Sequence, residues 1–458
     1  MRQKTELEIT LRAGARGEAR SAGAEGTEAR AATTEVESRA AGWPSMEAIV
    51  ERDNLRKALA QVKRNKGAAG VDGMSLGALA PYLKEHWPTI RAQLLDGTYK
   101  PQPVRRVEIP KASGGQRPLG IPTVLDRFIQ QAMLQVLQAD WDRTFSEHSY
   151  GFRPKRSAHQ AVTRAQEMIA ASHDVVVDID LEKFFDRVNH DILMGLVAKR
   201  VADKRILTLI RGFLTAGVLA DGLVGATEEG TPQGGPLSPL LSHLMLDVLD
   251  KELETRGLNF VRYADDCNIY VRSQRAGERV MASIERFLTG RLKLRVNKAK
   301  SAVARPGKRK FLGFSFTSGT QPRRRIASQS LARFRSRVRE LTRRTRGKSL
   351  AQIVKELSVY LTGWRGYFDF CETPSMLRDL DQWTRRRLRA IAWKQWKRGT
   401  TRFAELRRRG VGRDLAAQTA GSPHGPWRLS NSPALTIALP NAFLASLGLT
   451  SLVANKAA

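Results

Sequence analysis

The chain is poor in cysteine and has no long apolar run. Only Cys267 and Cys371 occur among its 458 residues, which excludes a disulfide framework and a zinc site with Cys-x-x-Cys spacing. No run of about 18 apolar residues is present, so no membrane span is expected. The first residues also lack the apolar segment of a secretory signal. These absences predict a cytoplasmic protein without a membrane partner.

Acidic residues are scarce relative to basic ones. The sequence has 77 Lys and Arg against 45 Asp and Glu, which gives a net charge of +32 and a pI near 10.8. Residues 301–410 alone contain 29 Lys and Arg against 7 Asp and Glu. An excess so concentrated repels itself unless a polyanion neutralises it. Nucleic acid is therefore favoured as the partner over a merely soluble basic surface.

Composition divides the chain into segments of different character. Residues 1–42 are rich in Ala, Gly, Glu and Arg and almost lack large apolar side chains, which predicts a disordered N-terminal extension. From Trp43 onward helical and strand-like patterns alternate, and from Ser328 basic helical patterns predominate. The expected elements include helices at 124–139 and 157–171, a buried strand at 175–180, and a strand pair around Leu294 and Phe311. The expected fold class is α+β.

Two adjacent aspartates, Asp265 and Asp266, stand between short apolar runs. Residues 260–263 and 267–271 are rich in strand formers, which predicts a β-hairpin with both carboxylates at its tip. Neighbouring anions repel each other, so a fold that keeps them usually has a cation to hold. The alternative is a solvated turn, because Asp is common in turns.

Asp180 ends the buried run 175–180 and supplies a third carboxylate. Asp178 and Asp180 are two residues apart and should point to one face of the strand. Together with Asp265 and Asp266, Asp180 could bind two Mg²⁺ ions about 3.5–4 Å apart, as polymerases do for phosphoryl transfer. Hard oxygen ligands suit Mg²⁺ rather than Zn²⁺.

Two further segments could approach a phosphate. Residues 230–239 are glycine-rich, with Ser238 expected as the N-cap and Pro239 as the first residue of a helix. Lys111 and Arg117 flank a Ser-Gly-Gly turn that would carry both cations toward one anionic group, such as a triphosphate. The first pattern is common at helix starts, and surface charges on a hairpin explain the second equally well.

Seven segments, in order, resemble the successive blocks of reverse transcriptases. They are residues 65–73 (NKGAAGVDG), 117–122 (RPLGIP), 149–154 (SYGFRP), 180–186 (DLEKFFD), 230–239, the Tyr-Ala-Asp-Asp hairpin and 311–314 (FLGF). The form seen here is similar to that of bacterial group II introns, whose proteins also act as splicing maturases. The 65–73 loop and the basic helical segment 360–398 carry this narrower resemblance, which extends from about residue 45 to the C-terminus.

The resemblance implies roles for individual residues. The catalytic metal ligands would be Asp180, Asp265 and Asp266, holding two Mg²⁺ ions. The nucleotide-binding residues would be Lys111 and Arg117 at the triphosphate, Phe185 under the sugar, Gln233 in the pocket wall, and Lys300 as proton donor to pyrophosphate. The RNA-binding residues would be Arg385, Arg386, Arg387, Arg389, Lys394, Lys397 and Arg398.

The protein implied is a right-hand polymerase with a basic α-helical thumb. Fingers and palm would occupy 43–320, the thumb or maturase domain 321–400, and a small C-terminal module without an HNH endonuclease 401–458. It would copy intron RNA into DNA and assist splicing, in the bacterial cytoplasm and partly on the nucleoid. Its partners would be intron RNA, an RNA template with a DNA primer, a DNA target and dNTPs. The alternative is a domesticated reverse transcriptase that serves phage defence or CRISPR spacer acquisition.

Overall fold

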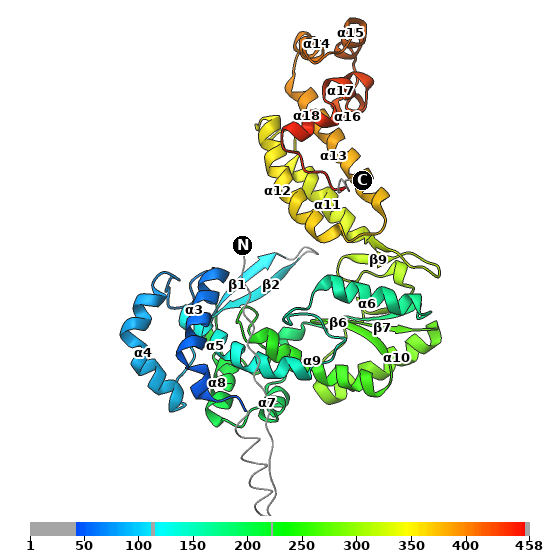
Figure 1. Cartoon of the computed structure of the whole chain (residues 1–458). Coiled ribbons are helices and arrows are strands. Elements are labelled where there is room, and N and C mark those ends of the chain that lie inside the picture. The colour runs from blue at the N-terminus through cyan, green and yellow to red at the C-terminus, as the bar shows by residue number, and fades with distance from the viewer. Residues whose placement is uncertain (1–42, 111–114, 221–222, 454–458) are drawn as a thin grey trace, which may run out of the picture.

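A computed structural model describes residues 43–110, 115–220 and 223–453. Two helix-and-sheet regions lie side by side, and a helical arm rises from one of them (Figure 1). The mixed α+β class expected from the sequence is confirmed. The predicted N-terminal extension, residues 1–42, lies outside the described residues. No helix in the described ranges combines the length and hydropathy that crossing a bilayer requires.

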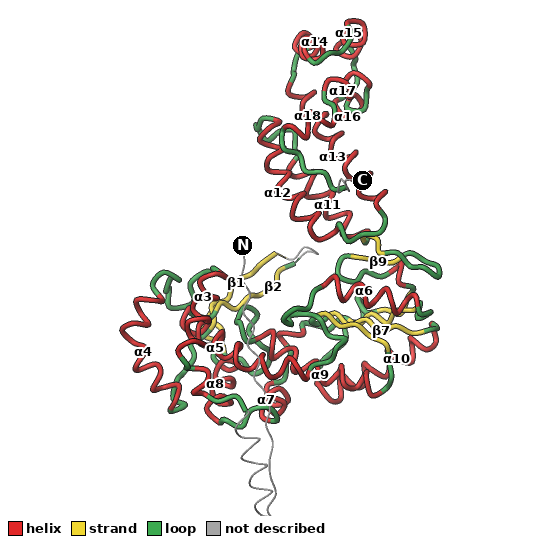
Figure 2. The backbone as a smooth tube through the Cα atoms, in the orientation of Figure 1, coloured by secondary structure: helices red, strands yellow, loops and turns green. Residues whose placement is uncertain are grey.

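A four-stranded antiparallel sheet forms the centre of one region. Its strand order is β6-β7-β3-β8, from Asn259–Tyr263, Asp266–Val271, Val175–Ile179 and Ala302–Ala304. Alternate side chains of β3 enter different cores: Val175 and Val177 pack with Ile284 of α10 (Gln274–Phe287), whereas Val176 packs with Val162 of α6 (Ala158–Ala170). The sheet is therefore covered on both faces, as the path of these helices shows (Figure 2).

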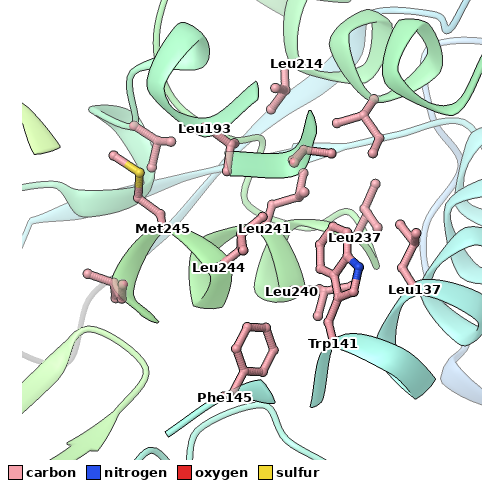
Figure 3. Packing of buried hydrophobic residues seen from close by; sticks show 14 of the residues in the cluster. Leu137, Trp141, Phe145, Leu193, Leu214, Leu237, Leu240, Leu241, Leu244 and Met245 are labelled. Atoms are coloured by element: carbon pink, nitrogen blue, oxygen red, sulfur yellow. The ribbon is translucent and has the colours of Figure 1, made fainter. Parts of the chain in front are cut away.

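The neighbouring region is mainly helical and carries a β-hairpin. Its helices are α2 (Met46–Ile49), α3 (Arg52–Asn65), α4 (Leu79–Leu95), α5 (Val124–Trp141), α7 (His190–Ala198), α8 (Lys204–Thr215) and α9 (Ser238–Thr255). Strands β1 (Val104–Pro110), β2 (Gln116–Ile121), β4 (Val218–Ala220) and β5 (Leu223–Gly225) form a second sheet in the order β2-β1-β4-β5. Leucines of α9 pack against Trp141 and Leu193 in one large core shared by both regions (Figure 3).

The arm consists of helices that continue the core of the sheet region. After β9 (Phe314–Phe316) and β10 (Arg324–Ile326), helices α11 (Ser328–Leu341), α12 (Leu350–Phe368) and α13 (Pro374–Gln395) pack through apolar faces into the same cluster as β3 and β6. A separate cluster joins the end of α13 to the C-terminal helices. These are α14 (Gly399–Arg408), α15 (Arg413–Ala420), α16 (Pro426–Leu429), α17 (Pro433–Ala438) and α18 (Asn441–Ser446).

Most expected elements are present, with two corrections. The strand pair placed around Leu294 and Phe311 was wrong: Leu294 follows a π-helical turn, and the nearby strands 302–304 and 314–316 pair with β3 and β10 and not with each other. The predicted N-cap was also wrong, because helix α9 begins at Ser238 and its cap position is Leu237. The Ser238 hydroxyl instead donates to the Pro232 carbonyl at 2.8 Å, which closes the preceding glycine-rich loop.

A buried ion pair ties α9 to the central sheet. Arg262 of β6 and Asp250 of α9 are both fully buried, and Arg262 Nε donates to Asp250 Oδ1 at 2.7 Å. His243, two turns before Asp250 on α9, lies beside the guanidinium. Burial, followed by the positive charges of Arg262 and Arg153, lowers the pKa of His243 to about 2, so the ring is neutral there.

Replacing Asp250 by alanine should strongly destabilise this region. The change leaves the Arg262 charge buried without its partner, at a cost of about 3–5 kcal/mol. The control is Asp191→Ala, which breaks an exposed pair with Arg211 on the surface and should cost less than about 1 kcal/mol. Urea unfolding followed by tryptophan fluorescence measures both, and equal shifts in the two variants would contradict the assignment.

Candidate active site

The Tyr-Ala-Asp-Asp segment forms the tip of the β6–β7 hairpin. Tyr263 pairs with Asp266 across the ladder, so Ala264 and Asp265 are the two turn residues. Ala264 adopts φ +56°, a left-handed conformation that is unfavourable for a residue with a Cβ atom. The hairpin predicted from the apolar runs is confirmed, and its tip is strained.

Asp180 lies beside this tip because of the register of β3 on β7. Ile179 pairs with Cys267, so one further step along the antiparallel ladder brings Asp180 opposite Asp266. The backbone of Asp180 is fixed on both sides: its N–H donates to Ser301 Oγ at 3.0 Å, and its carbonyl accepts from Asn297 N at 2.8 Å. The structure thus brings together the three aspartates that the sequence singled out.

The carboxylates at this place perturb one another. The pKa of Asp266 is raised to about 6, first by desolvation and then by the charges of Asp265, Asp178 and Asp180. Asp266 is exposed to solvent, so its desolvation is partial and the charges of the neighbouring carboxylates are an essential part of this shift. Asp178 is neutralised by Arg309, whose Nε lies 2.9 Å from Asp178 Oδ2.

The remaining carboxylates suit a hard divalent cation by their chemistry. Asp180, Asp265 and Asp266 offer only oxygen donors, and their mutual repulsion is what a bound cation relieves. In their present directions, however, no three acidic, histidine or cysteine side chains of the described residues are placed to hold an ion. The Asp180 carboxylate instead lies 3.5 Å from Lys300 Nζ. The donor set and the backbone placement therefore fit a metal, and ligation requires these side chains to turn.

A cleft of about 730 Å³ adjoins the tip. Its walls include Asp265, Phe185 and Gln233, three residues that the sequence assigned to one site. Phe185 is half-buried and packs edge-on against Phe184, with ring centroids 5.2 Å apart. Gln233 Nε2 donates to Asp186 Oδ1 at 3.0 Å, which orients its side chain.

A glycine contact brings β2 against the 230–239 loop at this cleft. A Cβ atom on Gly234 would lie 2.4 Å from the Gly120 carbonyl oxygen, and Gly120 N donates to Gln233 O at 2.9 Å. Only glycine permits this approach. Arg117 lies on β2 opposite Ile109, with its backbone alone described. Lys111 falls outside the described residues.

The basic residues predicted to bind RNA fall into two groups. Lys394, Lys397 and Arg398 are exposed at the end of α13 and just beyond it. The arginines before them are half-buried and make structural contacts: Arg387 Nε, for example, donates to Thr342 Oγ1 at 2.6 Å. Burial, followed by the positive charges of Arg339 and Arg344, lowers the pKa of Arg387.

The sequence did not predict the contacts that hold the hairpin tip in place. Arg262 Nη1 donates to the Ala264 carbonyl at 2.9 Å, so the buried ion pair with Asp250 also anchors the strained turn. A Cβ atom on Gly151 would lie 2.3 Å from Ala264 N, so the 149–154 segment packs directly against the turn. A charged residue inside an apolar strand was the available signal for Arg262, but nothing in the sequence pointed to its partner.

Two families match adjacent parts of the chain. Residues 109–316 match the family described as "Reverse transcriptase (RNA-dependent DNA polymerase)", and residues 331–410 match "Group II intron, maturase-specific domain". Protein YkfC of Escherichia coli K12 is 35% identical over 295 residues, which cover 56% of this chain and 77% of YkfC.

A second relative and a solved structure extend the comparison. Group II intron-encoded protein LtrA of Lactococcus lactis subsp. cremoris is 39% identical over 188 residues, 41% of this chain but only 31% of LtrA. A chain of the solved structure "Partial Cas6-RT-Cas1--Cas2 complex" is 21% identical to this chain, with a TM-score of 0.34. The alignment covers 54% of this chain and 42% of the chain in that complex.

Replacing Gly151 by alanine should loosen the hairpin tip. The added methyl group collides with the Ala264 backbone, and such overpacking costs about 1–3 kcal/mol. Hydrogen exchange of peptides that cover 259–271 should become about tenfold faster, and Mn²⁺ binding should weaken. Gly195→Ala in α7 is the control, because nothing lies within 4 Å of its added methyl group. Unchanged exchange in Gly151→Ala would show that this contact does not hold the turn.

Proposed function

The chain belongs to the reverse transcriptases that carry a group II intron maturase-specific domain, and we propose that it copies intron RNA into DNA at the Asp180–Asp265–Asp266 site. The observation that carries the proposal is the β3–β7 register, which sets Asp180 opposite the acidic hairpin tip. In this proposal the fold is a right-hand polymerase: residues 43–320 are fingers and palm, 321–400 the thumb, and 401–458 a C-terminal module.

The cleft beside the tip is proposed to receive the incoming deoxynucleotide. Phe185 would lie under the sugar, where its ring leaves no space for a 2′-hydroxyl, and Gln233 would contact the nucleotide from the neighbouring part of the wall. Arg117 and Lys111 would bind the triphosphate from the β1–β2 hairpin. Lys300, next to Asp180, is proposed to give a proton to the leaving pyrophosphate.

Reverse transcriptases generally use divalent metal ions, and we propose two Mg²⁺ ions held by the three aspartates. When bound, such ions neutralise the triphosphate and activate the attacking hydroxyl. The protein's own contribution is to hold three repelling carboxylates at one point, through the β-ladder for Asp180 and through Arg262 for the tip. Positioning and charge neutralisation provide most of the catalysis in phosphoryl transfer.

A second activity, RNA binding that assists splicing, is proposed for the arm. The maturase-specific match covers 331–410, within the segment where basic residues outnumber acidic ones about fourfold. Nucleic acids follow as partners from both matched families, and intron RNA, a DNA primer and a DNA target are the proposed ones. In this proposal the RNA performs the splicing chemistry, and the protein stabilises its fold by neutralising phosphates.

Asp265→Asn should abolish DNA synthesis while leaving RNA binding intact. Losing one carboxylate at the proposed metal site costs several kcal/mol of transition-state stabilisation, a fall on the order of 10³-fold or more in primer extension on an RNA template with Mg²⁺. Asp191→Asn, an exposed change elsewhere, should retain activity. Splicing of the intron should persist in Asp265→Asn. Loss of splicing with normal RNA binding would show that the two activities are not separable.

Phe185→Ala should relax the choice of sugar. Without the ring, a ribonucleotide fits the proposed pocket, so the kcat/KM ratio for CTP over dCTP should rise by about 10- to 100-fold. Phe152→Ala, an exposed ring on the wall of the same cleft, should leave the ratio unchanged. An unaltered ratio in Phe185→Ala would assign this residue to the core instead.

A further inference from the structure

A second cavity lies on the arm, far along the chain from the aspartates. It measures about 560 Å³ and is bounded by α13 on one side and by residues 431–441, which include α17 and the start of α18, on the other. Helix α13 contributes Trp383, Arg385, Arg386 and Arg389, and the C-terminal segment contributes the side-chain amides Asn431 and Asn441. The two sides come from segments about 50 residues apart, so the cavity exists only when the C-terminal helices pack on α13.

Two of the cavity's arginines have no acidic partner among the described residues. Arg386 donates to Ser430 Oγ at 3.3 Å and to the Trp427 carbonyl at 3.0 Å. Arg389 donates to the Leu439 carbonyl at 3.0 Å and to Asn441 Oδ1 at 3.2 Å. These neutral acceptors orient each guanidinium, and Arg386 also lies over the Trp427 ring at 4.1 Å from its centroid, but no carboxylate of the described residues neutralises either charge.

The third arginine has its own acidic partner and contributes little net charge. Arg385 pairs with Asp381 at 3.3 Å, and Ser451 Oγ and Leu452 N also donate to Asp381, which holds this pair in place. The pKa of Arg389 is lowered by burial and then by the nearby charge of Arg385. Asp379 on the wall offsets part of this excess, and the cavity remains positive overall. A site of this kind favours an anion that can accept several N–H donors at once.

The remaining walls suit a nucleobase. Trp383 lines the cavity, and aromatic side chains are the usual partners of unpaired bases. The Asn431 and Asn441 amides each offer donors and acceptors to a base edge. The volume is within the range of small-ligand pockets and is large enough for one nucleotide.

We propose that this cavity binds one unpaired ribonucleotide of the RNA held by the arm, with its phosphate on Arg386 and Arg389 and its base against Trp383. The inference rests on the proposed RNA-binding function and adds to it a specific subsite. The cavity distinguishes RNA with an extruded nucleotide from fully paired RNA. The exposed basic residues at the end of α13 neutralise the phosphates of either. The C-terminal module thereby acquires a role, because it supplies the amide wall.

The test uses the full chain and two RNA hairpins, one fully paired and one with a single 2-aminopurine bulge. The bulged hairpin should bind about 5- to 100-fold more tightly, with quenched 2-aminopurine fluorescence. Trp383→Leu should remove both the preference and the quenching. Asn431→Asp, an exposed and nearly isosteric change, should weaken binding of the bulged hairpin alone. The matched control is Arg378→Gln on the exposed face of α13, which should weaken both hairpins alike.

Each contrary outcome overturns a distinct statement. Equal affinity for the two hairpins, unchanged by Trp383→Leu and Asn431→Asp, would refute the subsite while leaving the RNA-binding function intact. Failure to bind either hairpin at moderate salt would refute the RNA-binding function itself. Because Asn431 is exposed, its variant should melt as the parent protein does, so a loss of binding there cannot be ascribed to unfolding.

Discussion

The Arg262–Asp250 ion pair lies beneath a turn whose tip carries two adjacent carboxylates. Those carboxylates and Asp180 repel one another, and Ala264 holds a left-handed conformation, so the tip is unfavourable in both charge and backbone geometry. The guanidinium offsets part of this cost by binding the Ala264 carbonyl, and it stays in place because Asp250 neutralises it inside the core. A buried pair adds little net stability on its own. Its role here is to fix where the turn can lie.

In the arm, several arginines join helices through neutral hydrogen-bond acceptors. Their positive charge therefore stays available to attract phosphate. Arg387 bonds Thr342 between α13 and the end of α11, and Arg386 and Arg389 bond carbonyls of the C-terminal segment. Carbonyl acceptors fix the position of a guanidinium without cancelling its charge. Helices joined in this way keep their guanidinium groups in fixed positions with the charge intact. Ion pairs would join the helices equally well, but the carboxylates would cancel the attraction for phosphate.

The sequence predicted the hairpin, the buried strand and the three aspartates because each depends on local pattern: apolar runs, period-two alternation and adjacent charges. It could not predict the support of the tip. Arg262 and Asp250 are twelve residues apart on different elements, and Gly151 meets Ala264 through tertiary packing alone. The strand pair was misplaced because the apolar residue Leu294 is buried from a loop that follows the π-helical turn 288–292, whereas the strand of this region is the short segment 302–304. The arginine-rich helical pattern predicted the position of the arm. It did not predict which arginines contact neighbouring helices and which face solvent.

The sheet region and the arm share one continuous core, which constrains how the two proposed activities relate. Arg324 of β10 lies at their junction, with its guanidinium 3.9 Å from the Phe370 ring centroid and its Nη1 2.6 Å from Gln166 of α6. Glu372, after α12, accepts from both Arg324 and Gln166. Such a satisfied polar network beside an apolar cluster resists hinge motion. If RNA binds along α13 as proposed, this junction holds it at a fixed distance and angle from the acidic tip, so the surface proposed to recognise the RNA would also determine which part of it reaches the cleft.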